Sequence, residues 1–280
     1  MTISENNHKA RTTREVHDIA AQLVRAREFG TFASRPSLTR PTLTLEEAYK
    51  TYLIAHSMLE DKDYSKRGRK LGFTNRQTWD EFELSAPIWA YVYEQTVEFE
   101  NKTAVEIESF ASPRIEPEIV LGLNQKILEY GTPGVPITDV VDWIAIGFEI
   151  VDCHYIRWNF SAPDIVIDFG AHARLIVGDL LRIDEERTTL EKLTESLSVR
   201  LFKDGDLVDT GRGKNVLGGP LKALNFLTKE LEKLPKQYSL RPGEIVTTGT
   251  LTKIPYIQKG EQWKVEVEGL KLNPLSIEVK

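Results

Sequence analysis

The sequence predicts an α+β fold, with a mostly-β core built from a mixed sheet and a helical N-terminal portion before it. Apolar residues recur at helical spacing in the early part of the chain, whereas short runs of β-forming residues dominate from Gly68 onward. Only two helical segments are recognisable in the later part, which disfavours a regular alternation of strands and helices. We therefore expect an N-terminal helical arm or cap over residues 1–65 and the main domain over residues 66–280.

The N-terminal arm should contain two helices joined by a loop. Residues 1–10 are polar, and we expect them to be disordered. Apolar residues from Val16 to Val24 have the spacing of a helix over Thr12–Phe29, and a loop with proline and serine follows. The run Thr44-Leu-Glu-Glu47 has the pattern of a capping box. It predicts a second helix that ends near Leu59.

Strands of the main domain are expected where short β-forming runs are bounded by turn-forming residues. These runs are Arg69–Thr74, Ala104–Ser109, Arg114–Leu123, Ile144–Asp152, Ala173–Val177, Leu197–Phe202, Ile245–Thr250, Gln262–Val267 and Leu275–Val279. Asp204-Gly205 has the composition of a hairpin turn between two β-forming segments. Helices are expected at Thr138–Trp143 and Leu221–Leu234, the second preceded by Pro220, which favours a helix start.

Composition limits the functions that the chain can have. Of its 280 residues, 41% are hydrophobic and 28% are charged, the proportions of a soluble globular protein. The net charge is −6 and no dense Lys/Arg tract occurs, so neither nucleic acid nor a membrane is an expected partner. No apolar run approaches about 18 residues, the length that predicts a membrane span. Because Cys153 is the only cysteine and residues 1–10 lack a secretory pattern, we expect a cytoplasmic protein.

The most informative feature is a pair of glutamates, Glu116 and Glu118, in a predicted strand. Residues two apart on a strand point to the same face, so these carboxylates should lie side by side among apolar neighbours. Glu149, inside the apolar run 147–152, is a third buried carboxylate. A divalent cation such as Mg²⁺ or Mn²⁺ would relieve the repulsion between them. The alternatives are solvated glutamates on an edge strand, and a pairing of Glu149 with Arg157 or Arg174.

Lys70 is the second residue with chemical potential. It lies among small and apolar residues in the run 68–75, which reads as a short strand. A desolvated lysine has a lowered pKa and can act as an acid or a base. The alternative is an ordinary surface lysine.

Five motifs, taken in order, resemble the fumarylacetoacetate hydrolase superfamily, and within it the 2-oxopent-4-enoate hydratase and 4-oxalocrotonate decarboxylase branch. They are Gly68-Arg-Lys-Leu-Gly-Phe-Thr74, Pro113-Arg-Ile-Glu-Pro-Glu-Ile119, Phe148-Glu-Ile-Val-Asp152, Val216-Leu-Gly-Gly-Pro220 and Ile245-Val-Thr-Thr-Gly249. The resemblance implies a barrel-like catalytic core over residues 66–280. It also implies that Glu116, Glu118 and Glu149 bind the metal and that Lys70 is the acid/base group.

Further site residues are expected around these motifs. We predict that Asp152 and His172 share the catalytic role with Lys70. Substrate-binding residues are expected at Leu71, Ile88, Trp89, Asp168, Arg174 and Thr248. Two departures from the family pattern bear on the substrate. Ile88 stands where hydratases commonly have an aspartate, and His172 replaces a small residue.

The resemblance and these departures together predict a divalent-metal-dependent lyase for small 2-oxo acids. Decarboxylation of a 4-oxalocrotonate-like 2-oxo diacid is the favoured reaction, because the metal would stabilise the dienolate that forms and Lys70 would move a proton. The alternatives are hydration of 2-hydroxypenta-2,4-dienoate and a degenerate homologue that only binds a partner. Hydrolysis is disfavoured, because none of the five histidines matches the water-activating histidine of the hydrolases. We expect a homo-oligomer, possibly associated with a related hydratase or decarboxylase subunit.

Overall fold

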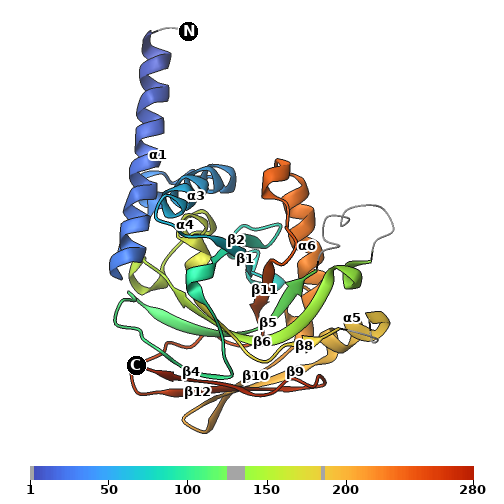
Figure 1. The fold of residues 1–280 in the computed structure, drawn as a ribbon. Helices are drawn as coiled ribbons and strands as arrows, with labels where there is room; N and C mark the ends of the chain where they lie inside the picture. Colours follow the sequence, from blue (N-terminus) through green and yellow to red (C-terminus); the bar gives the residue numbers. More distant parts are fainter. Residues whose placement is uncertain (1–2, 125–135, 184–186) are drawn as a thin grey trace.

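Two sheets form the body of the protein in the computed structural model, which describes residues 3–124, 136–183 and 187–280 (Figure 1). The larger sheet has eight strands in the order β2-β1-β11-β5-β6-β7-β3, with β8 beside β6, and it is mixed parallel and antiparallel. The smaller sheet has the order β10-β9-β12-β13-β4. The larger sheet curls beneath the helices α3 and α4, and the smaller sheet lies on its far side (Figure 1). The predicted α+β fold with a mostly-β core is confirmed.

The elements have the following bounds. The larger sheet consists of β1 (Lys66–Gly72), β2 (Ile88–Tyr93), β3 (Val97–Phe99), β5 (Pro113–Leu123), β6 (Val141–Asp152), β7 (His172–Val177), β8 (Leu181–Arg182) and β11 (Ile245–Thr250). The smaller sheet consists of β4 (Lys102–Val105), β9 (Ser198–Lys203), β10 (Asp206–Arg212), β12 (Gln262–Glu268) and β13 (Leu275–Val279). The helices are α1 (Ile3–Phe29), α2 (Pro36–Thr39), α3 (Leu45–Glu60), α4 (Ala162–Ile167), α5 (Arg187–Ser196) and α6 (Pro220–Glu232). None of these described helices is both long enough and apolar enough to cross a membrane.

The helix α3 begins at the predicted capping box. The Thr44 hydroxyl accepts a hydrogen bond from the Glu47 backbone amide at 3.2 Å, and the Glu47 carboxylate accepts one from the Thr44 amide at 3.0 Å. The helix α1 begins at Ile3, so the prediction of disorder is wrong for residues 3–10. That stretch contains neither glycine nor proline to end a helix. In Figure 1 its first turns extend away from the body.

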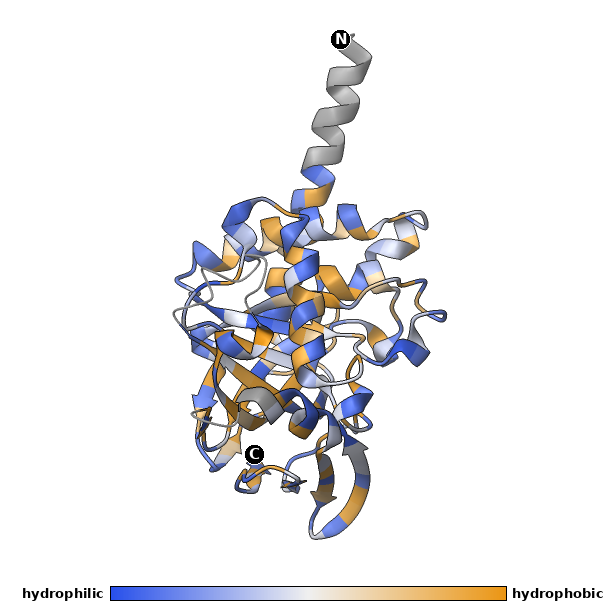
Figure 2. Ribbon diagram, turned by 90° about the vertical axis from the view of Figure 1, so that its right-hand side faces the viewer, coloured by the Kyte–Doolittle hydropathy of each residue, from blue (hydrophilic) through white to orange (hydrophobic). Residues whose placement is uncertain are grey.

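The N-terminal helices share their hydrophobic core with the sheet. Buried residues of α1 and α3 belong to the same cluster as those of β1, β2, β5 and β6, and in Figure 2 the hydrophobic colouring is concentrated inside the body. Two tyrosines of α3 also cover the edge strand β2. The Tyr52 hydroxyl accepts from the Tyr91 amide at 2.6 Å, and the Tyr49 hydroxyl accepts from the Trp89 amide at 2.9 Å. These bonds satisfy amides that an edge strand would leave unpaired. The division at residues 65 and 66 into two domains stays a prediction.

Several predicted boundaries are wrong. The expected helix at Thr138–Trp143 is a single 3-10 turn at Ile137–Val140, after which β6 begins. Pairing with β5 along its whole length overrides the weak helical pattern there. The strand expected at Ala104–Ser109 ends at Val105. Strand β2 and helix α4 were not anticipated; β2 is buried at all six positions and therefore shows no alternation of apolar and polar residues.

Candidate metal centre and active site

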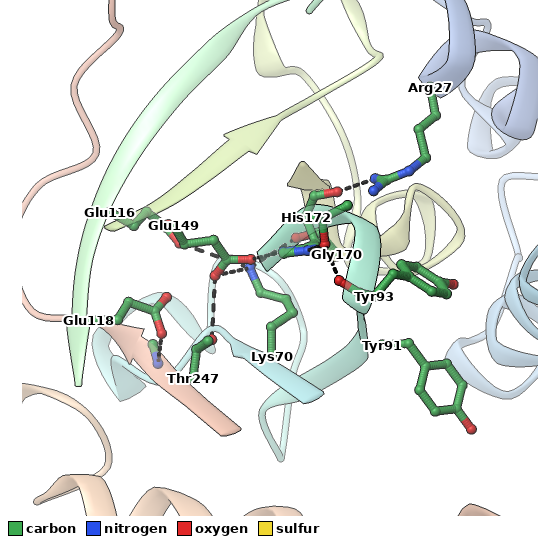
Figure 3. Close-up of polar contacts among 12 residues, drawn as sticks. Arg27, Lys70, Tyr91, Tyr93, Glu116, Glu118, Glu149, Gly170, His172 and Thr247 are labelled. Atoms are coloured by element: carbon green, nitrogen blue, oxygen red, sulfur yellow. Dashed lines mark hydrogen bonds and ion pairs between the residues drawn. The ribbon is translucent and has the colours of Figure 1, made fainter. Parts of the chain in front are cut away.

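Three glutamates meet on one face of the β5–β6 pair (Figure 3). Glu116 lies directly opposite Glu149 in the antiparallel register, and Glu118 lies two residues further along β5. All three side chains are buried, and one oxygen from each lies within 4.8 Å of the others. The structure therefore brings together the three carboxylates that we proposed as metal ligands.

Lys70 reaches the cluster from β1. Its Nζ lies 3.2 Å from Glu149 Oε2 and 3.9 Å from Glu116 Oε2, and it donates a hydrogen bond of 3.1 Å to the Gly170 carbonyl. Burial acts to lower the pKa of Lys70, but the attraction of Glu149, Glu116 and Glu118 outweighs burial and raises it. The predicted burial of Lys70 is confirmed, and its predicted lowered pKa is wrong for the protein without a metal. Lys70 is thus an ammonium that holds its proton.

The carboxylates are held unequally. Glu118 Oε2 accepts from the Gly249 amide at 2.7 Å, whereas Glu118 Oε1 is buried with no hydrogen-bond partner among the described residues. Gly249 has a φ of +96° and stands against Thr74, where an added Cβ would lie 1.9 Å from the Thr74 hydroxyl oxygen. Only glycine fits this position, so Gly249 brings a backbone amide to the cluster. The sequence signal was the motif that ends at Gly249, although it did not reveal this role.

The protonation of the three glutamates reflects a shortage of positive charge. Burial raises the pKa of Glu118 well above its ordinary value, and the charges of Glu149 and Glu116 raise it further. Burial also raises the pKa of Glu116, to about 7, against the opposing charge of Lys70. For Glu149, Lys70 and the hydrogen bond from His172 outweigh burial and lower the pKa to about 2. One ammonium does not balance three buried carboxylates, so a bound cation would stabilise them in the ionised form.

His172 lies behind the cluster. Its Nδ1 is 2.7 Å from Glu149 Oε1, its Nε2 is 2.8 Å from the Thr96 hydroxyl, and its carbonyl accepts from Arg27 of α1. The side chain is fully buried and is not among the described residues that line the cavity. Burial lowers the pKa of His172, so the neutral ring donates to Glu149 through Nδ1. The structure supports a role in orienting Glu149, in place of the predicted catalytic role.

A cavity of about 590 Å³ opens beside the cluster. Lys70 and Glu116 form part of its wall, as do Leu71 and Ile88, two of the predicted substrate-binding residues. Ile88 adds apolar surface to this wall. The sequence did not point to Arg114, whose cation also lines the cavity. Its signal was its place two residues before Glu116 on the same strand, which predicts the same face.

Two predicted site residues belong to a second buried acidic cluster. Asp152 follows Glu149 by three residues on β6, so it points to the opposite face. It accepts from the amides of Ala111 and Ser112 at 2.9 and 2.6 Å, and it lies 3.4 Å from His154 Nε2. Asp168 lies 2.7 Å from His154 Nδ1 and accepts from its amide at 2.9 Å. Neither aspartate lies among the described residues that line the cavity, so the structure does not bring them to Lys70.

Three further predicted substrate contacts also lie elsewhere. Trp89 alternates with Ile88 along β2 and stacks on Tyr49 of α3, with ring centroids 5.3 Å apart. Arg174 forms a part-exposed ion pair of 2.8 Å with Glu98. The Thr248 hydroxyl donates to the Ile119 carbonyl at 2.9 Å, which leaves it inside the sheet. None of the three is among the described residues of the cavity wall.

Both the sequence and the fold of the chain match known proteins. Residues 64–274 match the family model described as fumarylacetoacetate (FAA) hydrolase C-terminal. The chain is 24% identical to a 2-hydroxyhexa-2,4-dienoate hydratase of Comamonas testosteroni, over 82% of this chain and 85% of that protein. It is 25% identical to a 4-oxalocrotonate decarboxylase of a Pseudomonas species, over 84% and 88% of the two chains. The solved 4-oxalocrotonate decarboxylase from Pseudomonas putida G7, complexed with magnesium and adipate, superposes with a TM-score of 0.82 at 20% identity and covers 96% of this chain and 98% of that one.

Proposed function

Because the chain belongs to the fumarylacetoacetate hydrolase family, we propose that it is a divalent-metal-dependent lyase that acts on small 2-oxo acids. The observation that carries the proposal is the convergence of three buried carboxylates and Lys70 at the wall of one cavity. The relatives that support it are hydratases and decarboxylases, which are lyases. The retention of all four groups argues against a degenerate homologue that only binds a partner.

The residues present fit a divalent cation. Glu116, Glu118 and Glu149 offer oxygen atoms only, the donors that Mg²⁺ and Mn²⁺ prefer. The orphaned Oε1 of Glu118 is a buried acceptor that a cation would satisfy. A bound divalent ion would act as a Lewis acid on the 2-oxo group of a substrate.

The chain's own residues then supply proton transfer and a shaped site. Lys70 is protonated in the metal-free site, and a cation on the three carboxylates would weaken their hold on that proton. Because Lys70 lies at the cavity wall, it can deliver the proton to the carbon chain after the carboxylate leaves as CO₂. The Gly170 carbonyl holds the ammonium in place. His172 fixes the orientation of Glu149, because its Nδ1 hydrogen bonds one carboxylate oxygen and leaves the other facing Lys70.

Decarboxylation of a 4-oxalocrotonate-like 2-oxo diacid is the reaction we favour. Ile88 brings apolar surface into the cavity, on the face of the β1–β2 pair that carries Lys70. Addition of water to a distal alkene needs a polar group to orient the water, and this side chain provides none. Hydration of 2-hydroxypenta-2,4-dienoate is the second candidate. It is favoured by Thr78 and Asn75, polar residues on the same cavity wall that are able to orient a water molecule.

The test compares the two reactions on one preparation. 4-Oxalocrotonate and 2-hydroxypenta-2,4-dienoate are supplied separately with Mg²⁺ or Mn²⁺, and CO₂ and the hydroxy-oxo-acid product are quantified. We expect release of CO₂ to exceed hydration, and a chelator to stop both. Faster hydration than decarboxylation would reverse the assignment within the lyases, and activity that survives complete removal of divalent metal would overturn the proposal itself.

A further inference from the structure

Arg114 is a half-buried cation in the cavity that the proposed chemistry does not use. Besides Lys70, which is paired with carboxylates, the described positive residues of the cavity wall are Arg114, Arg157 and Lys253, and the last two are exposed. Asp209, the described acid of that wall besides Glu116, accepts from the Lys253 backbone amide at 2.8 Å. Arg114 is therefore the least solvated cation available to an anionic ligand in this cavity.

Two aromatic rings hold the Arg114 guanidinium. Its central carbon lies 4.3 Å from the ring centroid of Trp158 and 4.0 Å from that of Tyr256. The Nε atom is buried and has no hydrogen-bond partner among the described residues. Rings on a guanidinium fix its plane while leaving its N–H groups free to donate at the edge. A planar donor of this kind fits a carboxylate, which can accept two parallel hydrogen bonds.

The spacing along β5 matches the length of a short diacid. Arg114 and Glu116 are two residues apart on one face, a separation of about 7 Å along the strand. An extended carbon chain advances about 1.2 Å per bond, so the two ends of a six-carbon diacid lie about 6 Å apart. A ligand whose 2-oxo-acid end lies at the glutamate cluster and whose chain runs along β5 would bring its far end toward Arg114.

We infer that Arg114 binds the distal carboxylate of a 2-oxo diacid and so sets the preference for diacids over monoacids. The inference rests on the proposed function, since it needs the 2-oxo-acid end to lie at the glutamate cluster. It also replaces Arg174, one of the predicted substrate-binding residues, because the structure places Arg174 in an ion pair with Glu98 and not among the described residues of the cavity wall. The half-buried position of Arg114 between the two rings lowers the solvation of its charge, which makes an ion pair with substrate stronger than one in open solvent.

The test is equilibrium binding of two unreactive ligands of equal length, 2-oxoadipate and 2-oxohexanoate, in the presence of Mg²⁺ or Mn²⁺. Calorimetry gives both dissociation constants, and the change in tryptophan fluorescence, to which Trp158 contributes with the four other tryptophans, gives an independent measure. The parent should prefer the diacid. Arg114→Met should weaken the binding of 2-oxoadipate by about 10- to 100-fold, the range expected for the loss of hydrogen bonds to a charged group. Binding of 2-oxohexanoate should change by less than about threefold, because only the diacid loses a contact.

Further variants separate the competing explanations. Arg114→Lys keeps the charge without the planar fork, so an intermediate loss for 2-oxoadipate is expected. Lys253→Met removes an exposed cation from the same wall, and an equal loss there would show a diffuse charge effect and overturn the assignment to Arg114. The assignment would also be overturned if Arg114→Met weakened the binding of both ligands equally, or if it weakened the binding of neither. If the parent binds metal but neither ligand, both this inference and the proposed substrate class are wrong; if it binds no metal, the proposed function fails first.

Discussion

The two buried acidic clusters on opposite faces of β6 differ in how their charge is compensated. Asp168 hydrogen-bonds His154 Nδ1, Asp152 lies 3.4 Å from His154 Nε2 as an ion pair, and both aspartates accept from backbone amides, so one imidazolium faces two carboxylates. The cluster of Glu116, Glu118 and Glu149 has one ammonium for three carboxylates and an orphaned oxygen on Glu118. The first cluster has one cation for two acids and serves the fold, whereas the second has one cation for three acids, a larger deficit that a bound cation would correct. Burial of acids is thus a poor guide to function until the opposing charges are counted.

Removing one aspartate of the compensated cluster should have the largest effect. Burial acts to lower the pKa of His154, but Asp168 and Asp152 raise it, so the ring carries a proton. In Asp168→Asn this buried cation loses its charged partner, and we expect the free energy of unfolding to fall by about 3–5 kcal/mol. Chemical denaturation of the metal-free protein measures the change. An Asp168→Asn variant as stable as the parent would show that the two clusters do not differ in this way.

The matching change in the other cluster should have the opposite effect on stability. Glu118→Gln removes a carboxylate that is repelled by two neighbours, so the metal-free protein should be at least as stable as the parent. Its affinity for Mg²⁺ or Mn²⁺ should fall by more than about 100-fold, beyond the 10- to 100-fold typical of losing an outer partner. Calorimetric titration with Mn²⁺ gives the affinity. Unchanged metal affinity would remove Glu118 from the ligand set.

Lys70 belongs to the incomplete cluster and should matter for turnover more than for metal binding. Lys70→Ala removes the proton donor at the cavity wall, and we expect turnover to fall by about 10²-fold. Metal affinity should hold or rise, because the ammonium competes with a cation for Glu149 and Glu116. Turnover and a Mn²⁺ titration are measured on the same preparation. Turnover within a few-fold of the parent would assign Lys70 a structural role only.

His172 connects the incomplete cluster to the N-terminal helix and should have a moderate effect. His172→Leu removes the donor to Glu149 Oε1, and metal affinity should fall by about 10- to 100-fold. His172→Asn places an amide N–H near the position of Nδ1 and should restore most of that affinity. If His172 only fills space, His172→Leu and His172→Asn should lower the metal affinity to the same extent.

The sequence predicted the incomplete cluster better than its surroundings, for a physical reason. The alternation of side chains along a strand placed Glu116 beside Glu118 without any tertiary information. The register that sets Glu149 opposite Glu116 depends on how β5 pairs with β6, which no local pattern specifies. The same limit explains the errors at Asp152 and Trp89. Each of these two residues is the immediate neighbour of a cavity-facing residue, so its side chain points to the opposite face of the strand. Both strands are buried on both faces, so the hydrophobic pattern does not show which face carries the cavity.

The smallest expected effect concerns His56, a buried group that belongs to neither cluster. Burial lowers its pKa to about 4, so the native ring stays neutral beside the Tyr93 hydroxyl, 2.9 Å from Nδ1. Between pH 6.5 and 4 the unfolded chain binds a proton that the native state refuses. The free energy of unfolding should therefore decrease as the pH is lowered from 6.5 to 4, by at most about 1.4 kcal/mol per pH unit. Because other groups titrate in the same range, the measurement is the difference in this slope between the parent and His56→Asn. Equal slopes would mean that His56 is protonated as easily in the native protein as in the unfolded chain. A steeper fall in the parent would show that burial of His56 outweighs the opposing charge of Glu60, whose Oε2 lies 3.4 Å from His56 Nε2.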